Sequence, residues 1–432
     1  VYKRQRDARG IEVRSSYDRL GRLTTRDAGL ALHERVIDRW TYDSAAVVGG
    51  ARTQRGLLGL ESRQLRTGGT DSNPIYQTTY QRQYRYDDDL RPSGHNTTID
   101  PLEISNAKTY LVSIEHDPYF ARPFTMTWPE GNLRLYHRYD GQGYLFREGH
   151  SNDYQTANEV NHALRQVEVM SPIGQVVQER YGNSSVQQFA YNASTWQMNL
   201  AAAGNVAQSQ DYFDIDYRYD LYGNLQQQMK SWLPENQTTA RWIQEDYDYD
   251  HLHRLRFTNR YEGSGAAGTG ASNFYDEVEY TYTPNGNLRS KNDFGSNYTY
   301  NANQVSSVFL NEGQTQNYGY DANGNLQRAY LSSGVDRKLI DYDPYNKPTK
   351  IDDKVSGRVL QFSYGSNDQR FFQIKDGIED FTVYIDKLFE AYGNTNQNQD
   401  TGAKLYIGDY AVYDIELDTQ SSNAQANLTY LY

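Results

Sequence analysis

The chain of 432 residues contains no cysteine, which excludes disulfides, thiol nucleophiles and thiolate metal sites. Apolar residues are also scarce, at 37% even with tyrosine counted, so there is little material for several thick, dry cores. No apolar run approaches the roughly 20 residues that a membrane-spanning helix needs. The sequence therefore predicts no membrane span, and no signal peptide is recognisable.

Positively charged residues are also few relative to negatively charged ones. The 43 Lys and Arg residues are outnumbered by 55 Asp and Glu residues, which gives a formal net charge of −12. Proteins that bind nucleic acid or anionic membranes need basic surface to displace counterions. We therefore expect no nucleic-acid partner.

Tyrosine is abundant, with 40 copies. Its ring favours strands and packs as a large amphipathic slab, while its hydroxyl tolerates water. In 211–219, apolar and aromatic residues alternate with charged ones, which is the period of a half-buried strand. These features predict a broad antiparallel β surface that is wet on at least one face.

Residues 320–326 carry the pattern around which the chain is organised. Asp321 suits the first position of a type I turn, where its carboxylate accepts hydrogen bonds from backbone N–H groups. Gly324 supplies the positive φ that returns the chain to antiparallel pairing with a bulge. Tyr320 and Leu326 flank the turn, so the stretch predicts a hairpin hinge.

Diverged copies of this hinge recur along the chain. A type I turn accepts Ser or Thr at its first position and Pro at its second, and both substitutions occur. His253 and Asn346 occupy the glycine slot in two copies. The predicted structural turn residues are Tyr17, Asp18, Gly21, Tyr139, Asp140, Gly143, Tyr219, Asp220, Gly223, Tyr282, Pro284, Gly286, Tyr320, Asp321, Gly324, Tyr342, Asp343 and Pro344.

Two segments break the repeat. Residues 44–74 are rich in Gly, Arg, Ser and Thr, which predicts a surface loop or an irregular hairpin connection and the best internal boundary. A short amphipathic helix is an option near 156–166.

The hinge motifs resemble the YD repeats of rearrangement-hotspot (Rhs) proteins, of toxin-complex B and C components and of the teneurin YD shell. The resemblance covers most of the chain and is most specific at 282–350. It implies an all-β fold in which a long antiparallel strip of YD-repeat hairpins spirals into a hollow shell, here a part of one. It also implies a secreted or cell-surface-delivered protein whose partners are a C-terminal toxin cargo and the remaining shell segments.

The resemblance also sets expectations about organisation. Residues 1–5 are expected to be a non-native remnant, with a truncated N-terminus, and 6–432 a single shell segment with degenerate repeats in 6–135 and clearer ones in 136–432. The Asp-Pro-x-Gly motif associated with self-cleavage is absent, because no Asp-Pro pair is followed by glycine at the fourth position. The segment is therefore expected to lack both cargo and self-cleavage.

Three patterns bear on chemistry, and an enzymatic alternative rests only on the third. Gly263 to Gly268 fits a dinucleotide fingerprint in letters only, because no strand-turn-helix unit surrounds it. His251 and His253 have no evident third metal ligand. The aspartates of 214–216 and 246–250 alternate with tyrosines and aliphatic residues as a solvated strand face would. We predict no enzyme, catalytic residue, cofactor or metal.

The main competing function is a cell-surface carbohydrate-binding or adhesive repeat protein, because exposed tyrosine rings can stack on sugars. Tyrosine as sheet packing explains the same residues without a ligand.

Overall fold

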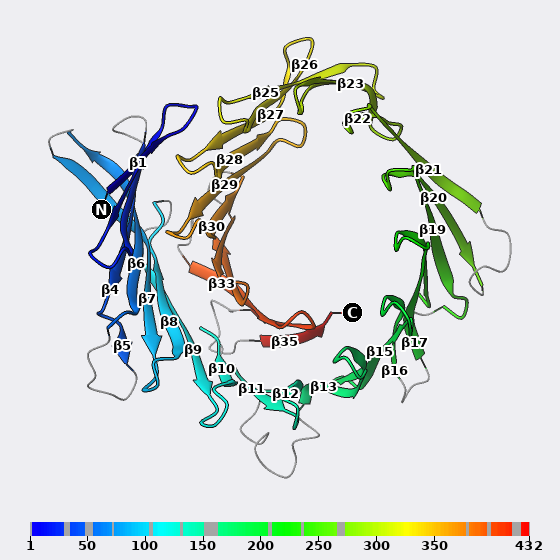
Figure 1. The fold of residues 1–432 in the computed structure, drawn as a ribbon, viewed down its shortest axis with the longest axis horizontal. Coiled ribbons are helices and arrows are strands. Elements are labelled where there is room, and N and C mark those ends of the chain that lie inside the picture. The colour runs from blue at the N-terminus through cyan, green and yellow to red at the C-terminus, as the bar shows by residue number, and fades with distance from the viewer. Residues whose placement is uncertain are drawn as a thin grey trace. The chain divides into compact units, whose positions relative to one another are not determined.

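The computed structural model describes residues 2–29, 35–47, 55–70, 73–102, 107–129, 133–150, 163–205, 210–234, 237–265, 273–376, 380–394, 399–416 and 425–431. Within these ranges the regular structure is entirely strand (Figure 1). No helix in them is long and apolar enough to cross a membrane.

The N-terminal part of the chain forms β1 (Tyr2–Arg6), β2 (Glu12–Tyr17), β3 (Leu23–Gly29), β4 (Val36–Tyr42), β5 (Ala46–Val47), β6 (Leu58–Gly69), β7 (Pro74–Tyr86), β8 (Pro92–Ile99), β9 (Lys108–His116) and β10 (Pro123–Thr127). Each strand pairs antiparallel with the next, except that β6 pairs with β4. The short β5 pairs in parallel with β7.

The middle of the chain continues with β11 (Arg134–Tyr139), β12 (Leu145–Gly149), β13 (Ala163–Met170), β14 (Val176–Tyr181), β15 (Ser185–Tyr191), β16 (Met198–Asn205), β17 (Gln210–Tyr219), β18 (Leu225–Trp232), β19 (Arg241–Tyr249), β20 (Leu255–Ser264), β21 (Asn273–Tyr282), β22 (Leu288–Lys291), β23 (Gly295–Asn301) and β24 (Gln304–Leu310).

The C-terminal part forms β25 (Thr315–Tyr320), β26 (Leu326–Leu331), β27 (Asp336–Tyr342), β28 (Pro348–Asp353), β29 (Arg358–Tyr364), β30 (Arg370–Lys375), β31 (Asp380–Ile385), β32 (Phe389–Asn394), β33 (Gln399–Ile407), β34 (Ala411–Glu416) and β35 (Gln425–Tyr430). All these strands belong to one antiparallel sheet apart from the parallel β5–β7 pair. The sheet is open, since β1 pairs with β2 and β35 with β34 at its described ends. The prediction of an all-β strip is confirmed.

The chain divides into two compact units. The first contains residues 1–134 and 318–431, and the second contains 135–317. In the first unit, aromatic side chains of N-terminal and C-terminal strands pack together. The ring centroids lie 5.3 Å apart for Tyr80 and Phe371, and 5.4 Å apart for Tyr110 and Phe389. The most deeply buried side chains of this unit include Phe372, Phe389 and Leu405.

The turn after β25 shows the geometry that recurs along one edge of the sheet. The Gly324 N–H donates to the Asp321 carbonyl at 3.0 Å, and the Asp321 carboxylate accepts from the N–H groups of Asn323 and Asn325 at 2.9 and 2.8 Å. Gly324 has a φ of 89°, in the left-handed region. The turn is therefore held by a side chain and by a backbone conformation together.

Seven tyrosines that directly precede a turn of this edge, the hinge tyrosines, bind the neighbouring hairpin. Each hydroxyl donates to a backbone carbonyl oxygen. The acceptor is the first residue of the strand that follows the previous turn of the same edge. The pairs are Tyr86 with Leu58, Tyr191 with Val176, Tyr249 with Leu225, Tyr282 with Leu255, Tyr300 with Leu288, Tyr342 with Leu326 and Tyr364 with Pro348, at 2.6 to 3.0 Å. One hydrogen bond thus joins successive hairpins beside their turns.

Burial accompanies these hydrogen bonds. It raises the pKa of the Tyr342 hydroxyl above its ordinary value and that of Tyr364 to about 12. The hydroxyls therefore remain protonated donors at neutral pH.

Two sequence-based predictions about irregular segments need correction. Much of 44–74 is strand rather than loop, because β6 spans twelve residues and pairs on both sides with β4 and β7. Both arginines of β6 are buried, because Arg63 forms an ion pair with Asp38 and Arg66 donates to the carbonyl oxygens of Gly68 and Gly69, so composition alone was misleading. The helix near 156–166 is wrong for 163–166, which begin β13, whereas 156–162 lie outside the described residues.

Replacing Gly324 with valine should lower the free energy of unfolding by roughly 1–3 kcal/mol, because a β-branched residue is forced toward positive φ. Urea or thermal unfolding measures the loss. Gly319→Val is the matched control, since Gly319 lies within β25 and an added Cβ there meets its nearest atom at 3.7 Å. Equal losses in the two variants would contradict the role given to φ.

Replacing Tyr342 with phenylalanine should cost about 1 kcal/mol, because the Leu326 carbonyl loses its tyrosine donor while the ring stays in place. Chemical denaturation is the measurement. Tyr275, which is 64% exposed, supplies the control Tyr275→Phe, for which we expect a change within about 0.5 kcal/mol. A Tyr342→Phe protein as stable as the parent would show that the hydroxyl contributes nothing.

Candidate functional site

The strongest concentration of buried charge lies where turns of the C-terminal strands contact the N-terminal strands. We call this region the docking seam. It consists of turns 321–324, 343–346, 365–368 and 386–388 against the turn 7–10, residues of β3, β4, β6, β7 and β8, and Trp128, all in the first unit. The turns are 21 or 22 residues apart along the chain.

Turn 321–324 contacts the turn between β1 and β2. The Asn323 side chain donates to the Asp7 carboxylate at 2.5 Å and accepts from the Ala8 N–H at 3.0 Å. Arg9 extends the contact, since its guanidinium donates to the carbonyl oxygens of Asp343 and Pro344 at 3.1 and 3.0 Å. Two C-terminal turns are thus fixed to one N-terminal turn.

The centre of the seam is a cluster of two arginines and two aspartates. Arg63 on β6 binds Asp38 on β4 through two hydrogen bonds of 2.7 and 3.0 Å, and the side chains of this pair are 3% and 0% exposed. Arg26 on β3 donates to Asp38 at 2.7 Å. Both arginines also donate to Asp368 at 2.9 Å. The two charges of each sign therefore balance.

An aromatic ring completes this cluster. The Tyr345 ring centroid lies 4.0 Å from the guanidinium carbon of Arg26 and 5.1 Å from that of Arg63. Such stacking stabilises a cation that has lost its water. Tyr345 is the third residue of its turn, the same position that Asn323 has in the first docked turn.

The third turn brings another carboxylate into the seam. Glu61 on β6 is 0% exposed and accepts hydrogen bonds from the Tyr84 hydroxyl at 3.0 Å and the Asn367 side chain at 2.7 Å. Asn367 again occupies the third turn position. Its hydrogen bond joins residues that are 306 apart in the sequence.

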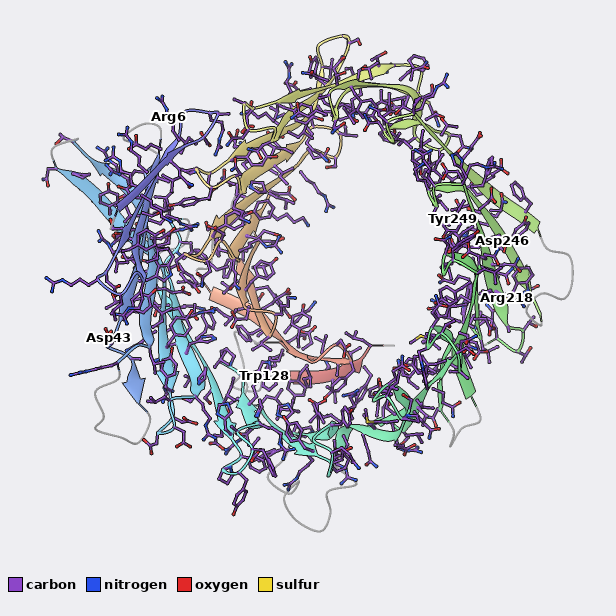
Figure 2. All side chains as sticks on the ribbon, viewed as in Figure 1. Arg6, Asp43, Trp128, Arg218, Asp246 and Tyr249 are labelled. Atoms are coloured by element: carbon purple, nitrogen blue, oxygen red, sulfur yellow. The ribbon has the colours of Figure 1, made fainter. Side chains whose placement is uncertain are left out.

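At the far end of the seam, turn 386–388 meets β7, β8 and the segment after β10. Arg82 donates to Asp386 at 2.8 Å and to Thr97 at 3.1 Å, and His95 lies 2.9 Å from the same aspartate. The Trp128 indole, labelled in Figure 2, donates to the Leu388 carbonyl at 3.0 Å. These contacts fix the last of the four turns.

The electrostatics of the seam differ from those of solvated turns. Burial alone would raise the pKa of Asp368, yet hydrogen bonds from Arg26 and Arg63 lower it below the ordinary value. For Asp343, burial dominates and the pKa rises. At the solvated turn of Asp250, hydrogen bonds from Arg254 lower the pKa to about 2.

The arrangement is suited to holding strands together rather than to catalysis. The seam carboxylates that carry the contacts all accept hydrogen bonds from arginine, amide, hydroxyl or backbone donors. No group of three potential metal ligands occurs in the part of the chain that the structure describes.

The predicted turn residues lie at hairpin ends throughout both units. Gly21, Gly143, Gly223, Gly286 and Gly324 all have positive φ. So do His253 and Asn346 in the glycine slots, at 59° and 64°. Within the predicted set, Asp321, Asp343 and Pro344 also belong to the docking seam. The remaining members are Tyr17, Asp18, Tyr139, Asp140, Tyr219, Asp220, Tyr282, Pro284, Tyr320 and Tyr342, which end strands or stand in turns.

The residues of the enzymatic alternative are not brought into one site. Asp246 and Tyr249 lie on β19, both labelled in Figure 2, and Asp246 accepts a hydrogen bond from Gln227 at 2.8 Å. Asp248 pairs with Arg256 across the sheet. The His253 ring nitrogen Nδ1 accepts a 2.9 Å hydrogen bond from the side-chain amide of Asn224, beside the preceding turn of this edge. Gly263 is the next-to-last residue of β20, and 266–268 lie outside the described residues.

Sequence reasoning missed the seam because its partners are about 300 residues apart. One local signal was present. In β4, Asp38 occupies the inward side between Val36 and Trp40, where the alternation calls for an apolar residue. A carboxylate in that position needs a buried partner.

Replacing Arg63 with methionine should lower the free energy of unfolding by roughly 3–5 kcal/mol, because Asp38 stays buried after losing its bidentate partner. The control is Arg256→Met, whose ion pair with Asp248 is 55% exposed on both sides and should contribute less than about 1 kcal/mol. Urea unfolding compares the two. A small, equal effect would show that the buried pair is dispensable.

Comparison with known proteins identifies structures with a similar fold. No family model and no curated protein matches the chain. Solved structures do match over 98% of it. They include the crystal structures of TcdB2-TccC3-TEV, with 14% identity and a TM-score of 0.59, and of TcdB2-TccC3, with 13% and 0.61. A third is the Photorhabdus luminescens Tc holotoxin pore, with 15% and 0.57.

The chain spans 22–23% of the length of these matched chains. With an identity of 13–15%, the likeness concerns the fold. The protein thus has the fold of a segment of the Tc toxin TcdB2-TccC3 chains, in agreement with the Rhs and YD-repeat resemblance of its turns.

Proposed function

We propose that this chain is a structural segment of an Rhs-type toxin shell that encloses a toxic C-terminal polypeptide. The observation that carries the proposal is the fold match over 98% of the chain to the TcdB2-TccC3 chains. The proposed partners are the remaining shell segments and the enclosed cargo. The proposed setting is a secreted or cell-surface-delivered complex.

The mechanism needs no catalytic residue. A wall of hairpins confines a polypeptide, and its polar strand faces limit adhesion of the cargo. In the first unit, the docking seam supports this role because it fixes a row of hairpin turns to a second set of strands. A wall held by side chains at its turns resists opening better than one held by single strand pairs.

Small-angle scattering on the purified chain tests the proposal. A compact globule of 432 residues should have a radius of gyration of about 22 Å, and an unfolded chain about 76 Å. A curved wall should give an intermediate value and an envelope with a solvent-filled interior or concavity. A solid globule, or separate beads on a string, would overturn the proposal.

Carbohydrate binding, the alternative suggested by the tyrosines, stays a prediction. Its motivation is the exposed aromatic side chains on turns, such as Tyr222, which is 80% exposed. A glycan array without saturable binding at high protein concentration would remove it.

A further inference from the structure

A pocket of about 510 Å³ opens between two turns of the docking seam. Buried side chains of Tyr80, Arg82 and Phe371 form its floor, at 4%, 7% and 2% exposure. Arg370, the first residue of β30, and Lys387, from the turn 386–388, stand exposed at its rim. Its volume falls within the range of small-molecule sites.

The lining of the pocket carries surplus positive charge. Arg82, Arg370 and Lys387 face a single lining carboxylate, that of Asp386, which Arg82 binds at 2.8 Å. His95 shares this carboxylate at 2.9 Å. Among the described residues, neither Arg370 nor Lys387 has a carboxylate within ion-pair distance. This local surplus of positive charge contrasts with the net charge of −12 of the chain.

Arg370 is held in place although it lacks an acidic partner. Its guanidinium carbon lies 4.4 Å from the Tyr384 ring centroid and 5.5 Å from that of Phe362. One N–H donates to the Gln373 side chain at 3.3 Å. Stacking orients the planar donor group while leaving donors for a ligand, and this group matches a carboxylate with two parallel hydrogen bonds.

The apolar part of the lining suits a flat ligand body. Tyr80, Phe371 and Tyr384 contribute rings, and Leu388 contributes an aliphatic side chain. The Tyr80 and Phe371 rings already contact one another at 5.3 Å. An aromatic ring in this pocket would gain offset or edge-to-face contacts with them.

We propose that this pocket binds a small aromatic carboxylate. The carboxylate is bound by Arg370 and Lys387 at the rim, and the ring lies against the aromatic lining. Because the lining comes from β7 on one side and from β30, β31 and the turn 386–388 on the other, the ligand bridges the two sides of the docking seam. Binding therefore stabilises the seam. This response to a ligand is additional to the proposed role of the chain as an enclosing wall.

Benzoate is the probe, tested on the full chain by calorimetric titration and thermal unfolding. We expect saturable binding of one benzoate per chain and a rise in Tm of a few degrees at saturating concentration. Acetate lacks the ring and benzyl alcohol lacks the charge, so each should bind at least tenfold more weakly. Equal binding of acetate would overturn the assignment of an aromatic ligand.

Variants locate the site. Arg370→Gln and Lys387→Gln replace exposed side chains and should each weaken benzoate binding at least tenfold, with the unliganded Tm nearly unchanged. Arg358→Gln is the matched control, because it removes an exposed positive charge at the start of β29, whereas Arg370 on β30 pairs with Tyr364 at the end of that strand; this variant should bind benzoate as the parent does. Absence of saturable binding, or parental affinity in Arg370→Gln, would overturn the proposal.

Discussion

The hydrogen bond from a hinge tyrosine to the carbonyl of the neighbouring hairpin is the interaction on which the strip depends. A two-stranded hairpin is marginal in water and must be stabilised by its neighbours. The hydroxyl of Tyr249, for example, donates to the Leu225 carbonyl beside a bulge, where the pairing of β17 and β18 shifts register. At least seven of the 40 tyrosines form such a hydrogen bond, a role that phenylalanine cannot fill.

The docking seam adds a second layer to the strip. A sheet with few apolar residues cannot bury enough surface by pairing strands alone. In the first unit, the third residues of the C-terminal turns, Asn323, Tyr345 and Asn367, add contacts to the turn 7–10 and to N-terminal strands. At the same turn position in the second unit, Ile173, Tyr222 and Leu252 are more than half exposed. The turn geometry is thus shared, while the third residue determines what the turn contacts.

Much of the fold was predictable because its signals are local. Alternation in 211–219 and the Tyr-Asp-x-x-Gly spacing specify strands and turns within a few residues. The seam was not predictable, since the partners of Arg63 and Glu61 include residues about 300 positions away and no local pattern indicates them. Composition also misled at β6, where Arg63 reads as a surface residue but is buried against Asp38. A hydropathy pattern does not identify a buried charged residue whose partner lies far away in the sequence.

The length of chain between seam partners has a consequence for the order of folding. The hydrogen bond between Asn323 and Asp7 closes a loop of 316 residues, and the logarithmic part of the entropy cost of such a loop is roughly 5 kcal/mol. Hairpins close only short loops, so they form with little loss of chain entropy. The contacts of the seam must offset this larger entropy cost, and only several contacts that form together can do so. The N-terminal strands therefore form their seam contacts only when the C-terminal turns are present. The first unit is completed only after the second has been synthesised.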